Sequence, residues 1–266
     1  MSAAPTVSLL DWGAGGFDLL ARLRAARPDL RLRYRSDAGF EPWGRLPPPA
    51  LAARVAEIVA QEQDAGADAV LLACNAASTA LPALRHDGVG AGLRFGLHGV
   101  IEPGVAAALA TGAERIGVLG GRRTIVSGGW ARPLRAAGRQ VQGRVAQPLS
   151  ARIETGDCDG PQTRALVQRL CAPLRDRELV VLACTHYPAA EAAIAAALPG
   201  VALLDPAQSA LAALLAALPA AAAGAEAAPT WAVFTSGDPS ATQRAARLAF
   251  GVETGEVRLA VDASRR

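Results

Sequence analysis

The chain has 266 residues, of which 51% are hydrophobic, and it carries a formal net charge of +3. That length suffices for one large α/β domain or for two smaller ones, each with its own core. The sequence contains no lysine. This absence excludes pyridoxal-phosphate enzymes, whose cofactor forms a Schiff base with a lysine, and nucleotide-binding proteins with a Walker A loop.

The distribution of charges and cysteines excludes several partners. The arginines are scattered among acidic residues and form no basic stripe, so we predict no nucleic-acid partner. The longest apolar stretch, ALAALLAALPAAAA from Ala210, falls short of the roughly 18–20 residues that span a bilayer, so we predict no membrane segment. The cysteines and histidines have no metal-site spacing, and the N-terminal segment has no signal-peptide pattern. We therefore predict a cytoplasmic protein without a metal.

Short, continuously apolar runs alternate with Ala/Leu-rich helical patterns along the chain. Such runs are typical of parallel strands that are covered by helices on both faces. We predict strands at the start of the stretches TVSLLDWGAGG, DAVLLACNAAS, ERIGVLGGRRT and ELVVLACTHYP, a short strand at 200–205, and a strand in WAVFTSG (231–237). The clearest helix between them is LAARVAEIVAQEQDAG from Leu51, and PAAAAGAEAAP (219–229) is predicted to be a surface connection. This order predicts the βαβ units of a doubly wound α/β fold.

Two of the predicted strands end in the same way. VLLACNAAS begins at Val70 and VVLACTHYP begins at Val180, and each apolar run ends in Ala-Cys followed by a polar residue. The repetition predicts two α/β halves whose cysteines meet in one cleft, because ligands bind beyond the carboxyl ends of parallel strands. We place the first domain at residues 1–98 plus 206–266, and the second at 99–205.

Cys74 and Cys184 are the first candidates for chemistry. A buried cysteine is usually only a small hydrophobic residue, and for each cysteine alone that interpretation stays open. Both, however, precede a predicted helix N-terminus, which lowers a thiol pKa and favours the thiolate. Two such thiols in one cleft suit the removal of a proton from one side of a carbon atom and its return to the other side. Cys158 and Cys171 lack this context, and we interpret them as structural.

Four polar residues accompany the two thiols. Asp11 ends the first predicted strand, where it either caps the turn or faces the cleft, and His186 follows the second thiol by two residues. Both are candidate proton partners. Asn75 and Thr185 each directly follow a cysteine, where they can cap a helix, bind a carboxylate, or do both. The glycines after Asp11 form no dinucleotide-binding GxGxxG motif, because an aspartate stands at the last glycine position.

Seven short motifs fall in the order seen in glutamate racemases: DWGAGG, PWG, ACNAAS, GVIEPG, TIVSGG, ACTHYP and FTSGD. The chain resembles that family over nearly its whole length, and THYP after the second cysteine is the most specific signal. The resemblance implies two pseudo-symmetric α/β domains with parallel sheets and an active site in the cleft between them. It also implies amino-acid racemisation without a cofactor. Members of the family are often dimers, so a homodimer is one option.

Carried over by position, the resemblance implies a role for each site residue. Cys74 would be the base for D-glutamate and Cys184 the base for L-glutamate, with Asp11 and His186 assisting the thiols. Asn75 and Thr185 would bind the α-carboxylate, and the backbone around Trp43 and Gly44 would bind the side-chain carboxylate. The complete substrate-binding set that it implies is Asp11, Trp12, Trp43, Gly44, Asn75, Ala76, Thr124, Thr185 and His186.

Four positions depart from the family's usual pattern. Trp12 stands in place of a serine, Trp43 in place of a tyrosine and Ala76 in place of a threonine, while Gln147 replaces the cysteine of many members. The first three lie where the family's substrate sits, and each lost hydroxyl removes about 1 kcal/mol of binding free energy. We predict racemisation of L- and D-glutamate, which would supply D-glutamate for peptidoglycan. Two alternatives stay open: a racemase or isomerase for another amino acid, and a catalytically weakened binding homologue.

Overall fold

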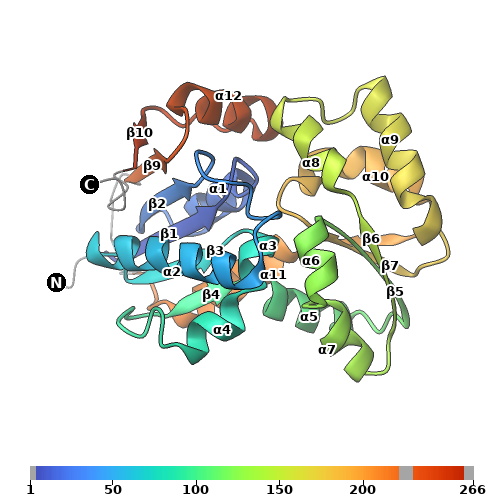
Figure 1. Ribbon diagram of the computed structural model, residues 1–266, viewed down its shortest axis with the longest axis horizontal. Coiled ribbons are helices and arrows are strands. Elements are labelled where there is room, and N and C mark those ends of the chain that lie inside the picture. The colour runs from blue at the N-terminus through green and yellow to red at the C-terminus, as the bar shows by residue number, and fades with distance from the viewer. Residues whose placement is uncertain (1–3, 222–229, 261–266) are drawn as a thin grey trace.

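Two entirely parallel β-sheets form the framework of the protein in the computed structural model, which describes residues 4–221 and 230–260 (Figure 1). The larger sheet has the strand order β10-β9-β2-β1-β3-β4. Its strands are β1 (Thr6–Asp11), β2 (Arg31–Ser36), β3 (Ala69–Leu72), β4 (Leu97–Gly99), β9 (Trp231–Thr235) and β10 (Val257–Leu259). The smaller sheet has the order β6-β5-β7-β8. Its strands are β5 (Arg115–Gly120), β6 (Gln140–Val145), β7 (Leu179–Ala183) and β8 (Ala202–Leu204).

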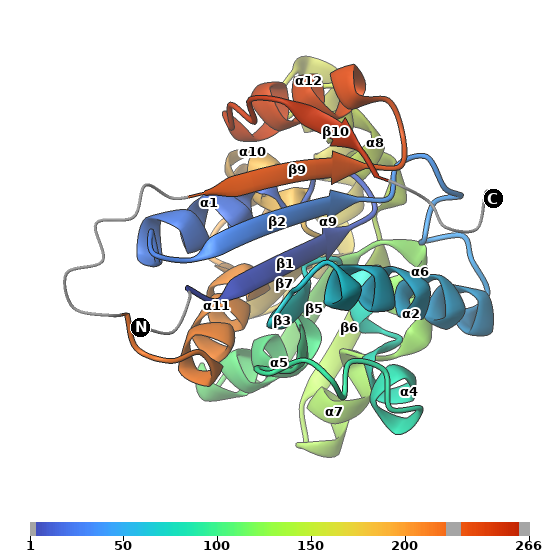
Figure 2. The same cartoon turned by 90° about the vertical axis from the view of Figure 1, so that its left-hand side faces the viewer.

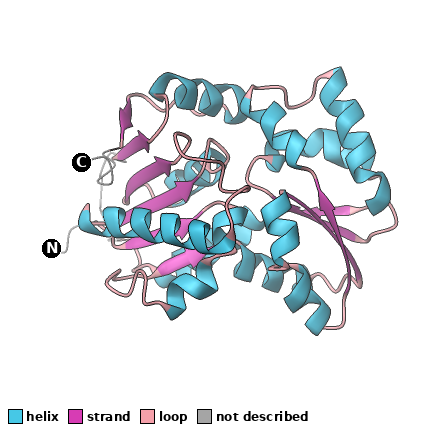
Figure 3. Ribbon diagram, viewed as in Figure 1, coloured by secondary structure: helices cyan, strands magenta, loops and turns pink. Residues whose placement is uncertain are grey.

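Helices cover both faces of each sheet (Figure 3), as the continuously apolar strands require. Those around the larger sheet are α1 (Phe17–Ala26), α2 (Pro48–Asp64), α3 (Asn75–Ser78), α4 (Leu81–His86) and α12 (Pro239–Phe250). Those around the smaller sheet are α6 (Arg122–Ser127), α7 (Ala131–Ala136), α8 (Gln147–Glu154), α9 (Pro161–Cys171) and α10 (Glu191–Ala197), with the 3₁₀ turns η1 (Ala172–Leu174) and η2 (Tyr187–Ala190). Every residue of β1, β3 and β7 is buried, which places these strands in the cores.

The two sheets repeat one winding pattern. In the larger sheet β2 lies on one side of β1, and β3 and β4 follow on the other side. In the smaller sheet β6, β5, β7 and β8 occupy the same relative places. The pattern makes β3 and β7 equivalent, and these are the strands that end in the two Ala-Cys turns. The repeated sequence therefore reflects a repeated supersecondary unit.

The two halves are joined by helices and by the returning C-terminal segment. Helices α5 (Ile101–Ala110) and α11 (Pro206–Ala217) pack against each other, and α11 also contacts β4 of one sheet and β7 of the other. Figure 2 shows β9 beside β2, although β9 comes near the end of the chain. The predicted fold class is confirmed, whereas the domain boundaries at residues 98/99 and 205/206 stay a prediction.

Two further predictions concern particular segments. Most of the predicted surface connection at 219–229 lies outside the described residues. Within the described ranges, no helix is long and apolar enough to cross a membrane.

Candidate active site

An open cleft of about 1030 Å³ lies where the carboxyl ends of the central strands of both sheets meet. All the residues that the sequence singled out line it: Asp11, Trp12, Trp43, Gly44, Cys74, Asn75, Ala76, Thr124, Cys184, Thr185 and His186. The structure therefore brings the whole predicted set together, and the chemical role of each member stays a prediction. No group of three or more metal-ligating side chains occurs in the part of the chain that is described.

The two cysteine turns are similar but not identical. Cys74 is the N-cap of the four-residue helix α3, whereas the chain after Cys184 bends into the 3₁₀ turn η2 before α10 begins. Burial raises the pKa of the Cys74 thiol well above its usual value, and the nearby Asp11 charge adds to this. Backbone N–H groups of Ala77 and Ala76 oppose the effect without overcoming it. The expectation that a helix N-terminus would favour the thiolate is thus wrong for Cys74, because desolvation outweighs the helix.

His186 is held between a thiol and a carboxylate. Its Nδ1 lies 3.8 Å from Sγ of Cys184, and its Nε2 lies 2.6 Å from Oε1 of Glu154. Burial lowers the pKa of His186, but the contacts with Cys184 and Glu154 outweigh it and raise the pKa well above the usual value. With both ring nitrogens facing acceptors, the imidazolium form fits the site best. Glu154 comes from the last turn of α8 and was not predicted from the sequence.

Asp11 lies at the end of β1, directly beside the first cysteine turn, because Ala73 donates its backbone N–H to the carbonyl of Leu10. Its carboxylate is buried and accepts hydrogen bonds from Oγ1 of Thr185 (2.9 Å) and from the backbone of Trp12 (2.7 Å). Burial raises the pKa of Asp11, and the His186 charge and these hydrogen bonds only partly oppose it. Each thiol thus has a buried titratable neighbour, Asp11 for the first and His186 for the second.

The glycines of DWGAGG allow the second half of the molecule to reach this carboxylate. A Cβ atom at Gly13 would collide with Glu154, and one at Gly15 would collide with Thr185 and His186. The missing side chains make room for residues that belong to the other sheet. These glycines therefore allow close contact between the two halves.

The amide of Asn75 has a fixed orientation. The indole Nε1 of Trp130 can only donate, and it lies 3.1 Å from Oδ1 of Asn75. The amide nitrogen of Asn75 is left buried, with no hydrogen-bond partner among the described residues. An unpaired buried donor costs about 1–3 kcal/mol, which a bound carboxylate would recover. Trp130 was not predicted, since a single tryptophan 55 residues away in the sequence gives no pairing signal.

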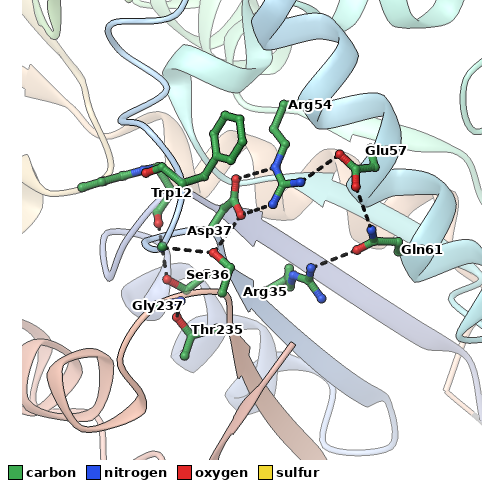
Figure 4. Close-up of polar contacts among 12 residues, drawn as sticks. Trp12, Arg35, Ser36, Asp37, Arg54, Glu57, Gln61, Thr235 and Gly237 are labelled. Atoms are coloured by element: carbon green, nitrogen blue, oxygen red, sulfur yellow. Dashed lines mark hydrogen bonds and ion pairs between the residues drawn. The ribbon is translucent and has the colours of Figure 1, made fainter. Parts of the chain in front are cut away.

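A buried aspartate, Asp37, fixes the loop that carries Trp43 and Gly44. Figure 4 shows Asp37 with its partner Arg54. Asp37 is 0% exposed, and its Oδ2 accepts hydrogen bonds from Nε1 of Trp43 (3.0 Å) and Nε of Arg54 (3.0 Å). Its Oδ1 accepts from Nη2 of Arg54 (2.7 Å) and Oγ of Ser236 (2.9 Å). The ring of Trp43 is itself buried, so the substitution of tyrosine by tryptophan fills the core behind the loop.

The remaining departures lie along the cleft wall. Nε1 of Trp12 donates to the carbonyl of Phe40 at an exposed position. Oε1 of Gln147 accepts from the backbone N–H of Arg122 and stands against Gly44, so it links the two walls. Ala76 is half-buried and lines the cleft with a methyl group. Thr124 is 3% exposed on α6, near the other end of this wall.

Comparison with known proteins gives one consistent result. The Asp/Glu/Hydantoin racemase family matches residues 44–214. A glutamate racemase of Beutenbergia cavernae is 33% identical over 281 aligned positions, which cover 98% of this chain and 94% of the relative. A glutamate racemase of Desulforudis audaxviator is 32% identical over 211 positions, 77% of this chain and 76% of the relative.

The fold gives the same answer. The crystal structure of glutamate racemase from Thermus thermophilus in complex with beta-chloro-D-alanine superposes with a TM-score of 0.85 at 28% identity, covering 99% of both chains. Because the superposition covers 99% of this chain, it includes both sheets. On sequence and fold together, the chain belongs to the Asp/Glu/hydantoin racemase family of isomerases, alongside the glutamate racemases.

Proposed function

We propose that the protein interconverts L-glutamate and D-glutamate without a cofactor, by two-base proton transfer at the α-carbon. The observation that carries this proposal is that one thiol from each half, Cys74 and Cys184, lines a single cleft. Each thiol lies near a buried group that can take or return a proton. Relatives that align with nearly the whole chain are glutamate racemases, which supports glutamate as the substrate.

The proposed L-to-D direction uses the two thiols in opposite states. The thiolate of Cys184 takes the α-proton of L-glutamate, and the thiol of Cys74 gives its proton to the opposite face of the carbanion. The raised pKa of Cys74 supports this step, because the buried thiol then keeps its proton at neutral pH. Before the next turnover in this direction, Cys184 loses the proton it took and Cys74 regains one, exchanged with solvent through His186 and Asp11 respectively. The unpaired amide nitrogen of Asn75 donates to the α-carboxylate.

We further propose a cytoplasmic homodimer that supplies D-glutamate for peptidoglycan. This part of the proposal is supported by the family alone. Light scattering on a size-exclusion column tests the dimer. Depletion of the protein in its host, with and without added D-glutamate, tests the role in the cell wall.

Hydrogen exchange in heavy water tests the activity. In early turnover from L-glutamate, we expect the D-glutamate product to carry deuterium at Cα while the recovered L-glutamate does not. A one-base mechanism would return substrate protium to the product. Hydrogen exchange with another amino acid but not with glutamate would favour a racemase or isomerase for that amino acid. Glutamate binding without any exchange would favour a binding homologue.

Serine variants test the two bases. Cys184→Ser and Cys74→Ser should each lower the racemisation rate by about 10²–10⁴-fold, since each removes a positioned acid or base. Glutamate binding should persist in both variants. Cys158→Ser is the matched control, because Cys158 does not line the cleft, and it should leave the rate unchanged. Near-normal rates in both cleft variants would rule out the two-thiol mechanism.

A further inference from the structure

The cleft is rich in guanidinium groups near the loop that carries Trp43. Arg45, Arg122 and Arg123 all line it. Within the described residues none of the three has a carboxylate partner. The carboxylates in the same cleft are already engaged, since Asp11 accepts from Thr185 and Glu154 pairs with His186. This wall therefore has positive charge that no side chain of the described protein neutralises.

Arg123 is the member of this group whose position is fixed. It is the second residue of α6 in the smaller-sheet half, and its Nη2 donates to the carbonyl of Leu46, which belongs to the Trp43–Leu46 loop of the other half. Its Nε is buried and has no hydrogen-bond partner among the described residues. Arg45 and Arg122, by contrast, are exposed. Arg123 is thus a half-buried residue of the cleft wall with donor capacity unused.

An unpaired buried N–H costs about 1–3 kcal/mol, and a planar guanidinium matches a carboxylate through two parallel hydrogen bonds. A carboxylate bound against Arg123 would use this capacity at little further cost. The amide of Asn75 and the thiols define the place of the α-carbon, so a group that reaches Arg123 lies farther along the substrate. A neutral side chain would leave the same donors without a partner.

We infer that Arg123 is a specificity-determining residue that binds the distal carboxylate of an acidic amino-acid substrate. The inference rests on the proposed function, because the thiols must act on an α-carbon in this cleft. It adds a side-chain contact to the backbone contacts expected at Trp43 and Gly44. In the competing interpretation Arg123 has only a structural role, in which it joins the two halves through its hydrogen bond to Leu46.

Calorimetric binding of glutamate and glutamine separates these interpretations, because the two ligands have the same length and differ in the distal charge. We expect Arg123→Gln to weaken glutamate binding by about 30- to 100-fold, while glutamine binding changes less than threefold. Arg123→Lys keeps the charge without the planar fork and should retain an intermediate affinity for glutamate. Arg132→Gln removes the same charge from an exposed position of α7 outside the cleft and should bind both ligands like the wild type.

An equal loss of affinity for glutamate and glutamine in Arg123→Gln would indicate a purely structural role and overturn the inference. No loss of affinity for either ligand would also overturn it. Thermal unfolding verifies that the variant is folded. If it is not, the comparison of both ligands is made with Arg123→Lys, which should lose affinity for glutamate alone. Wild-type protein that binds glutamate but does not exchange its α-hydrogen would refute the proposed function and leave the Arg123 assignment intact. If the wild type exchanges the α-hydrogen of glutamate, but Arg123→Gln loses the same affinity for glutamate and for glutamine, only the role of Arg123 would be refuted.

Discussion

The protonation of His186 depends on its contacts with Cys184 and with one carboxylate, that of Glu154. Glu154 accepts from Nε2 at 2.6 Å and helps to raise the pKa of His186 well above its usual value. Burial raises the pKa of Glu154, but the hydrogen bond and the charge of His186 together outweigh burial and lower this pKa below its usual value. The raised His186 pKa stabilises the fold below about pH 6.5, and this contribution is lost as pH rises through the folded value. The lowered Glu154 pKa stabilises the fold above about pH 4.5 and loses effect as pH falls.

Replacing Glu154 by glutamine should therefore change the pH dependence of activity. The neutral amide keeps the size of the side chain but no longer stabilises the imidazolium, so the pKa of His186 falls. We expect the alkaline limb of the racemisation profile to move to lower pH in Glu154→Gln. Glu102→Gln, which removes an exposed partner of Arg85, should leave the profile in place. If the alkaline limb of the profile does not move in Glu154→Gln, His186 takes no part in the rate-limiting proton transfer.

The sequence predicts some of these residues and misses others for a physical reason. Cys74 and Cys184 stand out because each ends a buried strand, and strand ends converge in a parallel sheet. Glu154 has no comparable sequence signal. It is a single acidic residue at the end of α8, and its partner His186 lies 32 residues away in the sequence. Its position depends on how the two halves pack, which no local pattern encodes.

At the level of elements, the loop after β2 depends on the buried Asp37 cluster. Trp43→Phe keeps the ring but removes one donor from Asp37, which retains the two hydrogen bonds of Arg54 and that of Ser236. We expect the free energy of unfolding to fall by about 2 kcal/mol, from the lost hydrogen bond and from the space that the smaller ring leaves in the core, and the KM for glutamate to rise. Trp12→Phe loses a hydrogen bond that is solvent-exposed, so its unfolding free energy should change by less than about 0.5 kcal/mol. Chemical denaturation measures the unfolding free energy of both variants. Equal losses in Trp43→Phe and Trp12→Phe would contradict the prediction.

Strand prediction succeeded where both faces of a strand are apolar and failed where arginines interrupt it. β1, β3, β5 and β7 appear as continuous apolar runs. The sequence RLRYRS of β2 does not, because its arginines find partners that only the folded chain supplies. Arg33 pairs with Glu62 of α2, and Arg35 donates to Gln61 on the same helix. β6 is an edge strand with mostly exposed or half-buried residues, so it also lacks an apolar run.

For the whole molecule, helix α12 connects the two halves beside the candidate active site. β9 pairs with β2, which returns the chain to the larger sheet, and α12 then contacts α8 of the other half. The ring of Phe250, at the end of α12, lies 6.3 Å from the ring of His186 in an edge-on arrangement. Phe250 packs against the cores of both halves. The last helix therefore couples the packing of the halves to the orientation of His186.

Phe250→Ala should loosen this connection. Because the side chain is half-buried, we expect a loss of about 2 kcal/mol in unfolding free energy, below the 3–5 kcal/mol of a fully buried phenylalanine. The melting temperature should fall by about 4–8 °C, and kcat should fall with it because His186 loses a neighbour. Phe250→Leu should restore most of both properties. Leu248→Ala, at a position 56% exposed on the same helix, should change neither. A stable Phe250→Ala protein with normal kcat would mean that α5 and α11 alone hold the halves in their catalytic arrangement.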